Sequence, residues 1–194
     1  MKPDDLDAAT LILAYQQGIF PMPDPDSGEI QFYQPHMRAI IPLDGFHVSR
    51  SLRKKISKAE YFVKTDSNFS AVMQQCANRP ETWITEAFFR AYGELHRAGC
   101  AHSLEIYQSD ALVGGVYGVT LGSAFFAESM FHTVSNMSKI ALYHLVCHLR
   151  ERDFQMLECQ FLTEHLASLG AIEISNESYL SRLDECLATA PRTF

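Results

Sequence analysis

The chain has 194 residues, enough for one domain with a small appendage, and its 47% hydrophobic and 20% charged residues are ordinary for a soluble globular protein. No apolar run approaches the roughly 20 residues that span a bilayer, and the acidic first residues lack the apolar core of a signal peptide. The net charge of −7 argues against indiscriminate binding to nucleic acid.

The N-terminal part of the chain is predicted to hold one helix and one extended segment. Residues 6–18 carry leucine and alanine at helical spacing and stop at a glycine. Residues 19–28 contain several prolines and predict a turn region, after which residues 30–42 are expected to be extended.

Residues 50–58 concentrate positive charge on an otherwise acidic chain. They hold five of the 16 basic residues and no acid, which leaves 11 basic against 23 acidic residues elsewhere, a net charge of −12. Arg50, Lys54 and Lys58 recur at i, i+4 and i+8 and so share one face of a predicted amphipathic helix. Such a face either binds a polyanion or is merely solvated.

A domain boundary is predicted after this helix, with a small N-terminal domain over residues 1–59 and a larger domain over residues 60–194. The larger domain is expected to begin with a strand at 61–65. Two helices are predicted next, at 66–78 and 85–99, each preceded by a plausible capping residue.

Residues 103–131 are the densest apolar and aromatic stretch, and they predict three consecutive strands with turns at 109–110 and 121–122. Strands this apolar suit a sheet that is buried on both faces. Three glycines interrupt the second strand, and close packing or a bulge explains them better than phosphate binding: Gly114, Gly115 and Gly118.

The last third of the chain alternates helices and strands. An apolar stripe predicts a long helix over 135–152, followed by a strand at 155–161. A short helix at 163–169, an extended segment at 172–174 and a last amphipathic helix at 177–187 complete the predicted elements.

The predicted order β, α, α, β, β, β, α, β, α is that of the Gcn5-related N-acetyltransferase fold. The fold class is therefore predicted to be α/β (α+β), with such a core, a mixed sheet and a small N-terminal domain. The strand at 123–131, the helix at 138–152 and the strand at 155–161 would form a right-handed βαβ unit, which makes the two strands candidate neighbours.

Glu128 is the one carboxylate in the apolar strand 123–131. A lone buried acid costs several kcal/mol, so Glu128 is either satisfied by its surroundings or binds a cationic ligand. The expected strand pairing brings it near Glu158 and Gln160, which strand parity places on one face. Two acids and an amide that converge in an apolar sheet predict a site.

Three other chemistries fit the residues less well. Coenzyme A needs a glycine-rich loop before the long helix, and residues 132–139 contain no glycine. His144 and His148 have the i, i+4 spacing of metal ligands, but no third ligand is evident and no metal is expected. Cys159 would face away from Glu158, so a buried structural cysteine is expected.

The five cysteines are odd in number and show no Cys-x-x-Cys spacing. This usage favours free thiols in a reducing cytoplasm over a disulfide scaffold or a zinc site. A cytoplasmic protein is expected.

Seven segments, in order along nearly the whole chain, closely resemble the leucyl/phenylalanyl-tRNA–protein transferases. They are AYQQGIFPM (14–22), TWIT (82–85), AHSLEIY (101–107), LVGGVYGVTLGSAFFAESMF (112–131), SKIAL (138–142), LECQF (157–161) and HLASLGA (165–171). The resemblance implies a Gcn5-related core with a small N-terminal domain. It also implies transfer of leucine or phenylalanine from aminoacyl-tRNA to proteins with N-terminal arginine or lysine, which marks them for degradation. Neither a cofactor nor a metal is required, and neither a membrane nor DNA is an expected partner.

The resemblance implies how tRNA is bound. Trp83 matches a tryptophan that stacks on the terminal adenosine, although a core tryptophan is also a physically reasonable interpretation. Tyr33 falls where the family usually has a second tryptophan, and a tyrosine ring can also stack on a base. The basic helix matches contacts to the tRNA backbone, through Arg50, Arg53, Lys54, Lys55 and Lys58.

The resemblance also implies the substrate pockets. Five residues that pattern alone would place in the core match a pocket for the donor's leucine, phenylalanine or methionine side chain: Val116, Phe125, Leu142, Leu145 and Leu157. Glu128 matches the acid that holds the acceptor's cationic side chain. Glu158 and Gln160 match an aspartate and a glutamine that activate or position the α-amino group, and the glutamate here is one methylene longer.

Two departures from the family keep an alternative open. They are Glu158 itself and an N-terminal lead shorter than the usual one, which carries a Gly-Gly-Asp segment. The alternative is a binding module that captures tRNA or N-terminal peptides without transfer. A small-molecule acyltransferase dependent on coenzyme A is a third hypothesis, weakened by the missing glycine loop. Attack of an amine on an activated ester depends mainly on positioning and on a group that shares a proton.

Overall fold

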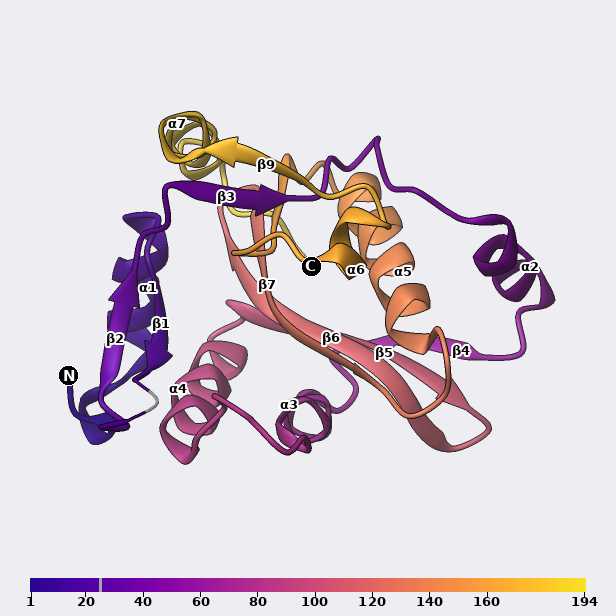
Figure 1. Cartoon of the computed structure of the whole chain (residues 1–194), viewed down its shortest axis with the longest axis horizontal. Helices are drawn as coiled ribbons and strands as arrows, with labels where there is room; N and C mark the ends of the chain where they lie inside the picture. Colours follow the sequence, from indigo (N-terminus) through magenta and orange to yellow (C-terminus); the bar gives the residue numbers. More distant parts are fainter. Residues whose placement is uncertain (25) are drawn as a thin grey trace.

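The computed structural model describes residues 1–24 and 26–194, and it contains two sheets and helices on both sides of the larger sheet (Figure 1). The larger sheet has seven strands. Its order is β4 (Phe62–Thr65), β5 (Ala101–Gln108), β6 (Ala111–Leu121), β7 (Ala124–His132), β8 (Met156–Glu158), β3 (Met37–Ile40) and β9 (Ile172–Ser175). Neighbours are antiparallel except β7 and β8, so the sheet is mixed. The predicted α/β class and mixed sheet are confirmed.

The N-terminal residues form a helix and a separate hairpin. A one-turn 3-10 helix (Pro3–Asp5) precedes α1 (Ala8–Gln16), which begins where the Asp7 side chain accepts a hydrogen bond from the Thr10 N–H at 2.8 Å. Next, β1 (Phe20–Pro23) pairs with β2 (Ile30–Tyr33).

The prediction of a turn region over 19–28 is wrong for β1. A two-stranded ribbon consists of edge strands, and an edge strand tolerates prolines because one side of its backbone needs no partner. The burial of Phe20 and its contacts with the rings of Tyr33 and Phe161 hold the strand in place. Pro25, which belongs to the same prediction, lies outside the described residues.

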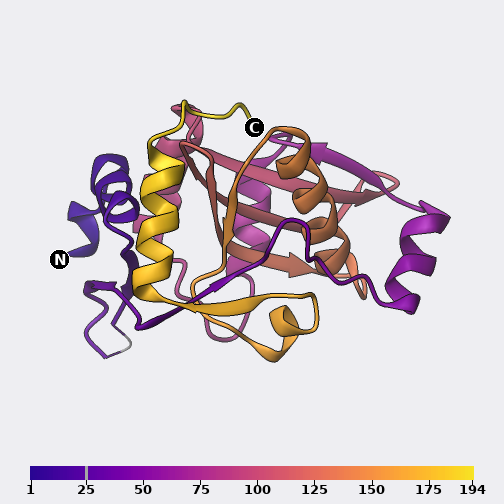
Figure 2. The ribbon, with the colours of Figure 1, turned by 90° about the horizontal axis from the view of Figure 1, so that it is seen from above.

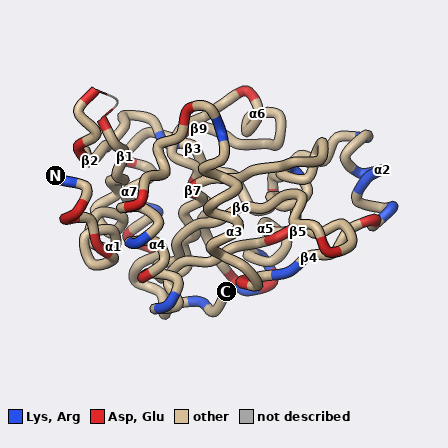
Figure 3. The backbone as a smooth tube through the Cα atoms, turned by 90° about the horizontal axis from the view of Figure 1, so that it is seen from below, with Lys and Arg blue, Asp and Glu red and all other residues tan. Residues whose placement is uncertain are grey.

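The predicted basic helix is confirmed as α2 (Arg50–Lys58), and each bound agrees with the sequence pattern. The Ser49 hydroxyl accepts from the Leu52 N–H at 3.2 Å, and the helix ends at Ala59, which has a left-handed φ of 49°. Leu52 is buried, whereas the basic side chains point mainly into solvent. In Figure 3 the blue positions of α2 lie at one end of the backbone tube.

The first 59 residues spread across the molecule. Figures 1 and 2 both place α1, β1 and β2 at the end opposite α2. Between them β3 lies inside the larger sheet, where it pairs with β8 and β9. The division of the chain into domains at residue 59 stays a prediction.

The sheet separates two apolar clusters. On one face α1, α3 (Phe69–Ala77) and α4 (Glu86–Arg97) pack in a cluster that includes Phe126, and on the other α5 (Met137–Glu151) packs in a cluster that includes Phe125 (Figure 1). The remaining helices, α6 (Glu164–Ala167) and α7 (Asn176–Leu187), flank β9. Within the described residues, no helix combines the length and the apolar character needed to cross a bilayer.

The glycines of β6 permit close packing, as predicted. A Cβ on Gly114 would lie 2.6 Å from the Met137 Cβ, and a Cβ on Gly118 would collide with the Phe126 carbonyl oxygen and the Phe125 ring. The strand register also shifts between Tyr117 and Gly118. Gly114 therefore allows α5 to pack closely against β6, and Gly118 allows Phe125 and the β7 backbone to lie close to β6.

The parallel pairing of β7 and β8 confirms the predicted βαβ unit, with Phe125 opposite Leu157 and Phe126 opposite Glu158. The second strand is shorter than the predicted 155–161, since it ends at Glu158. Gln160 has a left-handed φ of 57°, which no strand residue adopts. The parity argument that placed Glu158 and Gln160 on one face is therefore wrong.

Candidate active site

Glu128 is aimed by an irregularity in β7. Ser129 pairs with Tyr117 and Ala127 pairs with Gly118, so Glu128 is the extra residue of a β-bulge. Bulges turn side chains and are common beside active sites. The bulge follows three fully buried residues, and the Glu128 side chain is partly exposed.

Three side chains lie within hydrogen-bonding distance of the Glu128 carboxyl group. The Tyr15 hydroxyl lies 2.7 Å from Oε1, the Tyr92 hydroxyl lies 2.8 Å from Oε2, and Gln160 Nε2 lies 3.2 Å from Oε1. Burial raises the pKa of Glu128 to about 7, although the two tyrosine hydroxyls act in the opposite direction. A carboxyl group with this pKa changes charge near neutral pH.

Glu158 forms a buried ion pair instead of facing a cavity. Its Oε1 lies 2.8 Å from Nη2 and 3.2 Å from Nε of Arg38, and both side chains are almost completely buried. Arg38 also donates to the Gly18 carbonyl and lies over the Tyr179 ring, 4.0 Å from its centre. Burial raises the pKa of Glu158, and the Arg38 charge opposes that effect. The pair fixes the end of β8.

Gln160 connects the two carboxylates. Its backbone N–H donates to Glu158 Oε1 at 2.7 Å, while its side-chain Nε2 donates to Glu128 Oε1. Sequence analysis correctly expected Glu128, Glu158 and Gln160 to lie together, although the left-handed backbone at Gln160 produces the contact.

Two small cavities meet at Glu128, and they share Glu128, Cys159, Gln160 and Leu166. The apolar cavity, about 100 Å³, is further lined by Val116, Ala127, Ser129, Met130 and Leu142. The aromatic cavity, about 210 Å³, is further lined by Phe20, Pro21, Met22, Trp83, Phe161 and Thr163. A carboxylate and an amide thus stand between a pocket for an aliphatic group and a pocket walled by rings.

The residues expected to form the donor pocket are only partly brought to the apolar cavity. Val116 and Leu142 line it, whereas Phe125, Leu145 and Leu157 are fully buried behind it in the same apolar cluster. Substrate could reach the first two directly and the other three only through them.

The aromatic residues expected to bind tRNA lie near each other. Trp83 lines the aromatic cavity, and Tyr33 stacks on Phe20, another lining residue, with ring centres 6.3 Å apart. Cys159 is buried, as predicted, and burial raises the pKa of its thiol, although the residue is among those that line both cavities.

The basic helix lies apart from Glu128. A third cavity, about 400 Å³, separates α2 from α5 and is lined by Lys54, Lys55 and Lys58 together with Tyr61. It shares no lining residue with the two cavities at Glu128. A ligand that contacts both α2 and Glu128 must therefore be extended.

Sequence analysis missed Arg38, Tyr15 and Tyr92. Tyr15 comes from α1, Tyr92 from α4 and Arg38 from β3. The one available signal was a polar group in an otherwise apolar pattern, and that pattern does not show which distant carboxylate each group meets.

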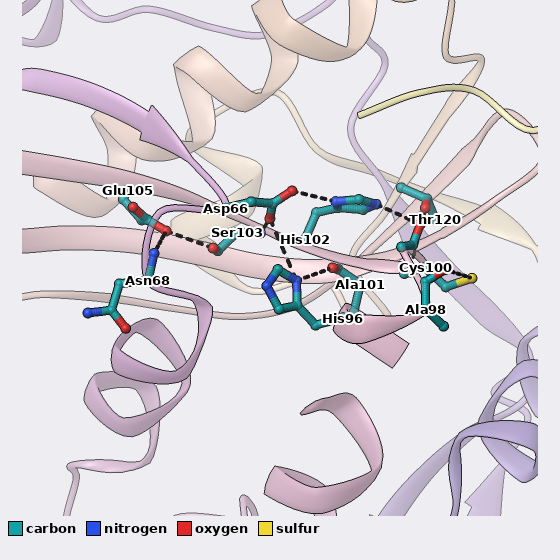
Figure 4. Close-up of polar contacts among 11 residues, drawn as sticks. Asp66, Asn68, His96, Ala98, Cys100, Ala101, His102, Ser103, Glu105 and Thr120 are labelled. Atoms are coloured by element: carbon teal, nitrogen blue, oxygen red, sulfur yellow. Dashed lines mark hydrogen bonds and ion pairs between the residues drawn. The ribbon is translucent and has the colours of Figure 1, made fainter. Parts of the chain in front are cut away.

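A further polar cluster lies away from the cavities, around the turn between β4 and α3 (Figure 4). The Asp66 carboxylate accepts from the Ser103 N–H at 2.8 Å and contacts His102 Nδ1 at 2.7 Å. Although partial burial opposes it, contact with His102 and Ser103 lowers the pKa of Asp66. Glu105 Oε1 accepts from the Asn68 N–H at 2.8 Å. These contacts fasten the start of α3 to β5.

Known proteins match the chain along most of its length. A family model described as leucyl/phenylalanyl-tRNA protein transferase matches residues 40–184, and a model of the N-terminal domain of that transferase matches residues 4–36. A leucyl/phenylalanyl-tRNA–protein transferase of Cereibacter sphaeroides is 52% identical over 188 residues, which cover 96% of this chain and 88% of the relative. One of Salinibacter ruber is 45% identical over 189 residues, covering 97% and 84%.

Among solved structures, the crystal structure of FemX superposes with a TM-score of 0.54 at 12% identity, over 89% of this chain and 70% of that one, which is a likeness of fold alone. The mixed-sheet fold, the carboxylate and amide between two cavities and the sequence matches together define an aminoacyltransferase. The chain belongs to the leucyl/phenylalanyl-tRNA–protein transferase family.

Proposed function

We propose that this enzyme transfers leucine or phenylalanine from aminoacyl-tRNA to the α-amino group of proteins with N-terminal arginine or lysine, which marks them for degradation. One observation carries the proposal: the Glu128 carboxylate lies where an apolar cavity and an aromatic cavity meet. A donor with an apolar side chain and an acceptor with a cationic one would therefore bind with their reacting groups side by side.

The apolar cavity receives the donor side chain in this proposal. Val116, Leu142 and Met130 give it an aliphatic surface that suits leucine, phenylalanine or methionine. Its volume of about 100 Å³ is small, and Met130 is the flexible wall that can yield to a larger ring. Phe125, Leu145 and Leu157 support this wall from behind.

The aromatic cavity receives the terminal adenosine of the tRNA. Trp83 is partly buried and lines it opposite Phe20 and Phe161, so a base can stack there without a sequence-specific contact. Tyr33 extends this aromatic surface through its contact with Phe20.

The body of the tRNA is bound by α2. Its exposed cations can neutralise phosphates. Lys55 of α2 lines the cavity between α2 and α5, where its Nζ donates to the Ser135 carbonyl at 3.0 Å. The residues proposed for these contacts are Arg50, Arg53, Lys54, Lys55 and Lys58. The separation of α2 from Glu128 fits a ligand as long as the acceptor arm of a tRNA.

The acceptor's cationic side chain binds Glu128 in the proposed complex. Gln160 touches the α-amino group, because its Oε1 makes no hydrogen bond to a described residue while its Nε2 is held by Glu128. Glu158 takes part as a positioning residue: its ion pair with Arg38 holds the carboxylate that accepts the Gln160 N–H. Because Glu158 is almost completely buried and lines neither cavity, it does not contact the substrate directly in this proposal.

The reaction needs no metal and no organic cofactor. The amine nitrogen attacks the ester carbonyl carbon, the bond from that carbon to the ribose oxygen breaks, and the surplus amine proton passes to the released ribose oxygen or to water. Since the ester is already activated, holding the two substrates in register supplies much of the rate.

The finer fold assignment is part of the same proposal. The order β4, α3, α4, β5, β6, β7, α5, β8 supports a Gcn5-related N-acetyltransferase core, preceded by the smaller N-terminal part. A cytoplasmic location follows from the aminoacyl-tRNA donor and is supported by five free cysteines.

A transfer assay tests the proposed function. The protein is incubated with radiolabelled Leu-tRNA and a peptide that starts with arginine, and label is expected in the peptide. Glu128→Gln should lower transfer about 30-fold or more, because losing a desolvated ion pair costs on the order of 2–5 kcal/mol. Binding of Leu-tRNA without any transfer by the wild type would instead identify a binding module.

A further inference from the structure

The oxygen atoms of Tyr15, Tyr92 and Glu128 form a closed ring of short contacts. The two phenol oxygens lie 2.6 Å apart, Tyr15 lies 2.7 Å from Glu128 Oε1, and Tyr92 lies 2.8 Å from Glu128 Oε2. All three separations are those of O–H···O hydrogen bonds. Each such bond requires its own proton.

The number of protons in the ring depends on the charge of Glu128. Each phenol supplies one proton, and an ionised carboxylate supplies none, so two protons would have to serve three contacts. If the carboxyl group is protonated, the count becomes three. Glu128 Oε2 then donates to Tyr92, Tyr92 donates to Tyr15 and Tyr15 donates to Glu128 Oε1, so each of the three contacts has its own proton.

The surroundings of the ring favour the protonated form in the empty site. Tyr15 and Tyr92 are fully buried, and burial raises the pKa of both phenols well above its usual value, so neither proton is lost near neutral pH. Tyr117 faces Glu128 from β6 with its proton similarly retained. Glu158 adds a negative charge from β8, and the nearby Arg38 cation is already paired with it.

We propose that Glu128 is a carboxylic acid in the empty site, closed into a ring with the hydroxyl groups of Tyr15 and Tyr92, and that a cationic N-terminal residue binds by displacing its proton. The inference rests on the proposed function of Glu128 as the acceptor site. Protons and charge balance in this step. The carboxylic acid of Glu128 releases one proton to solvent, and the resulting carboxylate forms an ion pair with the bound cation. Afterwards the two tyrosines donate to the carboxylate, and their mutual contact loosens.

This exchange makes the tyrosines specificity residues. A neutral N-terminal residue offers no positive charge to replace the proton, so the closed ring persists and competes with its entry. A cationic residue offers full charge compensation. Affinity for cationic acceptors should therefore increase as pH rises through the pKa of Glu128, since a proton no longer has to be displaced.

Calorimetry without donor tRNA tests the exchange. The full chain is titrated with a peptide starting with arginine, in buffers of different ionisation enthalpy. A second titration uses the same peptide starting with citrulline, which has nearly the shape of arginine but no charge. Close to one proton should be released per arginine peptide at about pH 6 and close to none above about pH 8. The citrulline peptide should release none, and it corrects for the shared α-amino group.

Carbon-13 NMR of glutamate carboxyl groups tests the empty site directly, with Glu128→Gln used to assign the signal. A midpoint near neutral pH supports a protonated Glu128 in the empty site. Ionisation at the ordinary pKa of a glutamate, with no proton released on binding, overturns it even if transfer activity is intact. If the wild-type protein shows no transfer activity, the proposed function is overturned instead. Tyr107→Phe, which removes a phenol beside a different carboxylate, Glu105, should leave the midpoint unchanged.

Discussion

Glu128 occupies its position because β7 contains one residue more than β6 opposite it. The sequence revealed the acid, its strand and its neighbouring strand, because period-2 patterns and the right-handed βαβ rule are local or nearly so. It did not reveal the bulge, which leaves no mark in the pattern. It also could not reveal that Tyr15 and Tyr92, 77 positions apart, meet at this carboxylate.

The charge of Glu128 should make stability depend on pH. Its pKa is about 7 in the folded protein against 4.5 for an ordinary glutamate, so the unfolded chain loses this proton first as pH rises. Between the two values the folded state binds more protons, and stability must fall with increasing pH. Relative to Glu128→Gln, whose amide can preserve the ring, the wild type should lose on the order of 1–3 kcal/mol from about pH 5 to about pH 8.

Urea denaturation of both proteins across that pH range measures the difference, in which the other titrating groups cancel. A constant difference would show that Glu128 has the same pKa in the folded and unfolded chains.

Breaking the buried ion pair of Arg38 and Glu158 should destabilise the protein far more than removing an exposed positive charge. Arg38→Met leaves a buried, unpaired carboxylate, and breaking a buried pair on one side typically costs about 3–5 kcal/mol. Arg50→Met, on the exposed face of α2, should change stability by about 0.5 kcal/mol or less. Chemical denaturation of the two variants compares them, and equal small effects would mean that Glu158 is not desolvated in the native protein.

At the scale of elements, the donor cavity depends on how β6 and β7 face α5. Val116→Leu adds one methylene to a lining residue and should reduce kcat/KM for phenylalanine roughly tenfold more than for leucine. Val119→Leu is the matched control, because Val119 is equally buried in β6 but lies in the cluster on the other face. Steady-state transfer with Phe-tRNA and Leu-tRNA gives both ratios; an equal loss for both donors would place the side chain elsewhere.

Helix α2 should set the salt dependence of tRNA binding. Changing Arg50, Lys54 and Lys58 to glutamate should weaken binding and reduce the slope of log K against log salt by about 2–3, because roughly one counterion is released per neutralised phosphate. The control changes three other exposed cations to glutamate and alters the net charge equally: Lys64, Arg97 and Arg182. Filter binding at several salt concentrations distinguishes the two triple variants. If both behave alike, overall charge and not α2 governs binding.

The elements differ in how well the sequence predicted them. The predicted span 50–58 agrees with α2, since the positive charges that defined the pattern extend over the whole helix. The strand β1 was missed because its prolines imitate a turn. The end of β8 was placed too late, because Gln160, which contacts its near neighbour Glu158 and the distant Glu128, has a left-handed backbone in a sequence that is compatible with a strand.

For the whole molecule, the sequence predicted the element order after residue 60 and the parallel pair, while the place of β3 came only from the structure. Met37–Ile40 is inserted between strands that lie more than a hundred residues further along the chain. Pairings this distant have no local periodic signal. For the same reason the two cavities, which join residues from β1, β7 and the segment after β8, could not be delineated from pattern alone.

The place of β3 also has a consequence for biosynthesis. As the polypeptide leaves the ribosome, β3 emerges early, but neither hydrogen-bonding neighbour exists until β8 and then β9 have been made. Until then Arg38 in this short strand lacks Glu158, the carboxylate that neutralises its charge in the folded protein. A nascent chain halted before β8 therefore lacks Gln160 and the end of the sheet that orients Glu128. The unpaired edge of β3 in such a chain is open to association with strands of other chains.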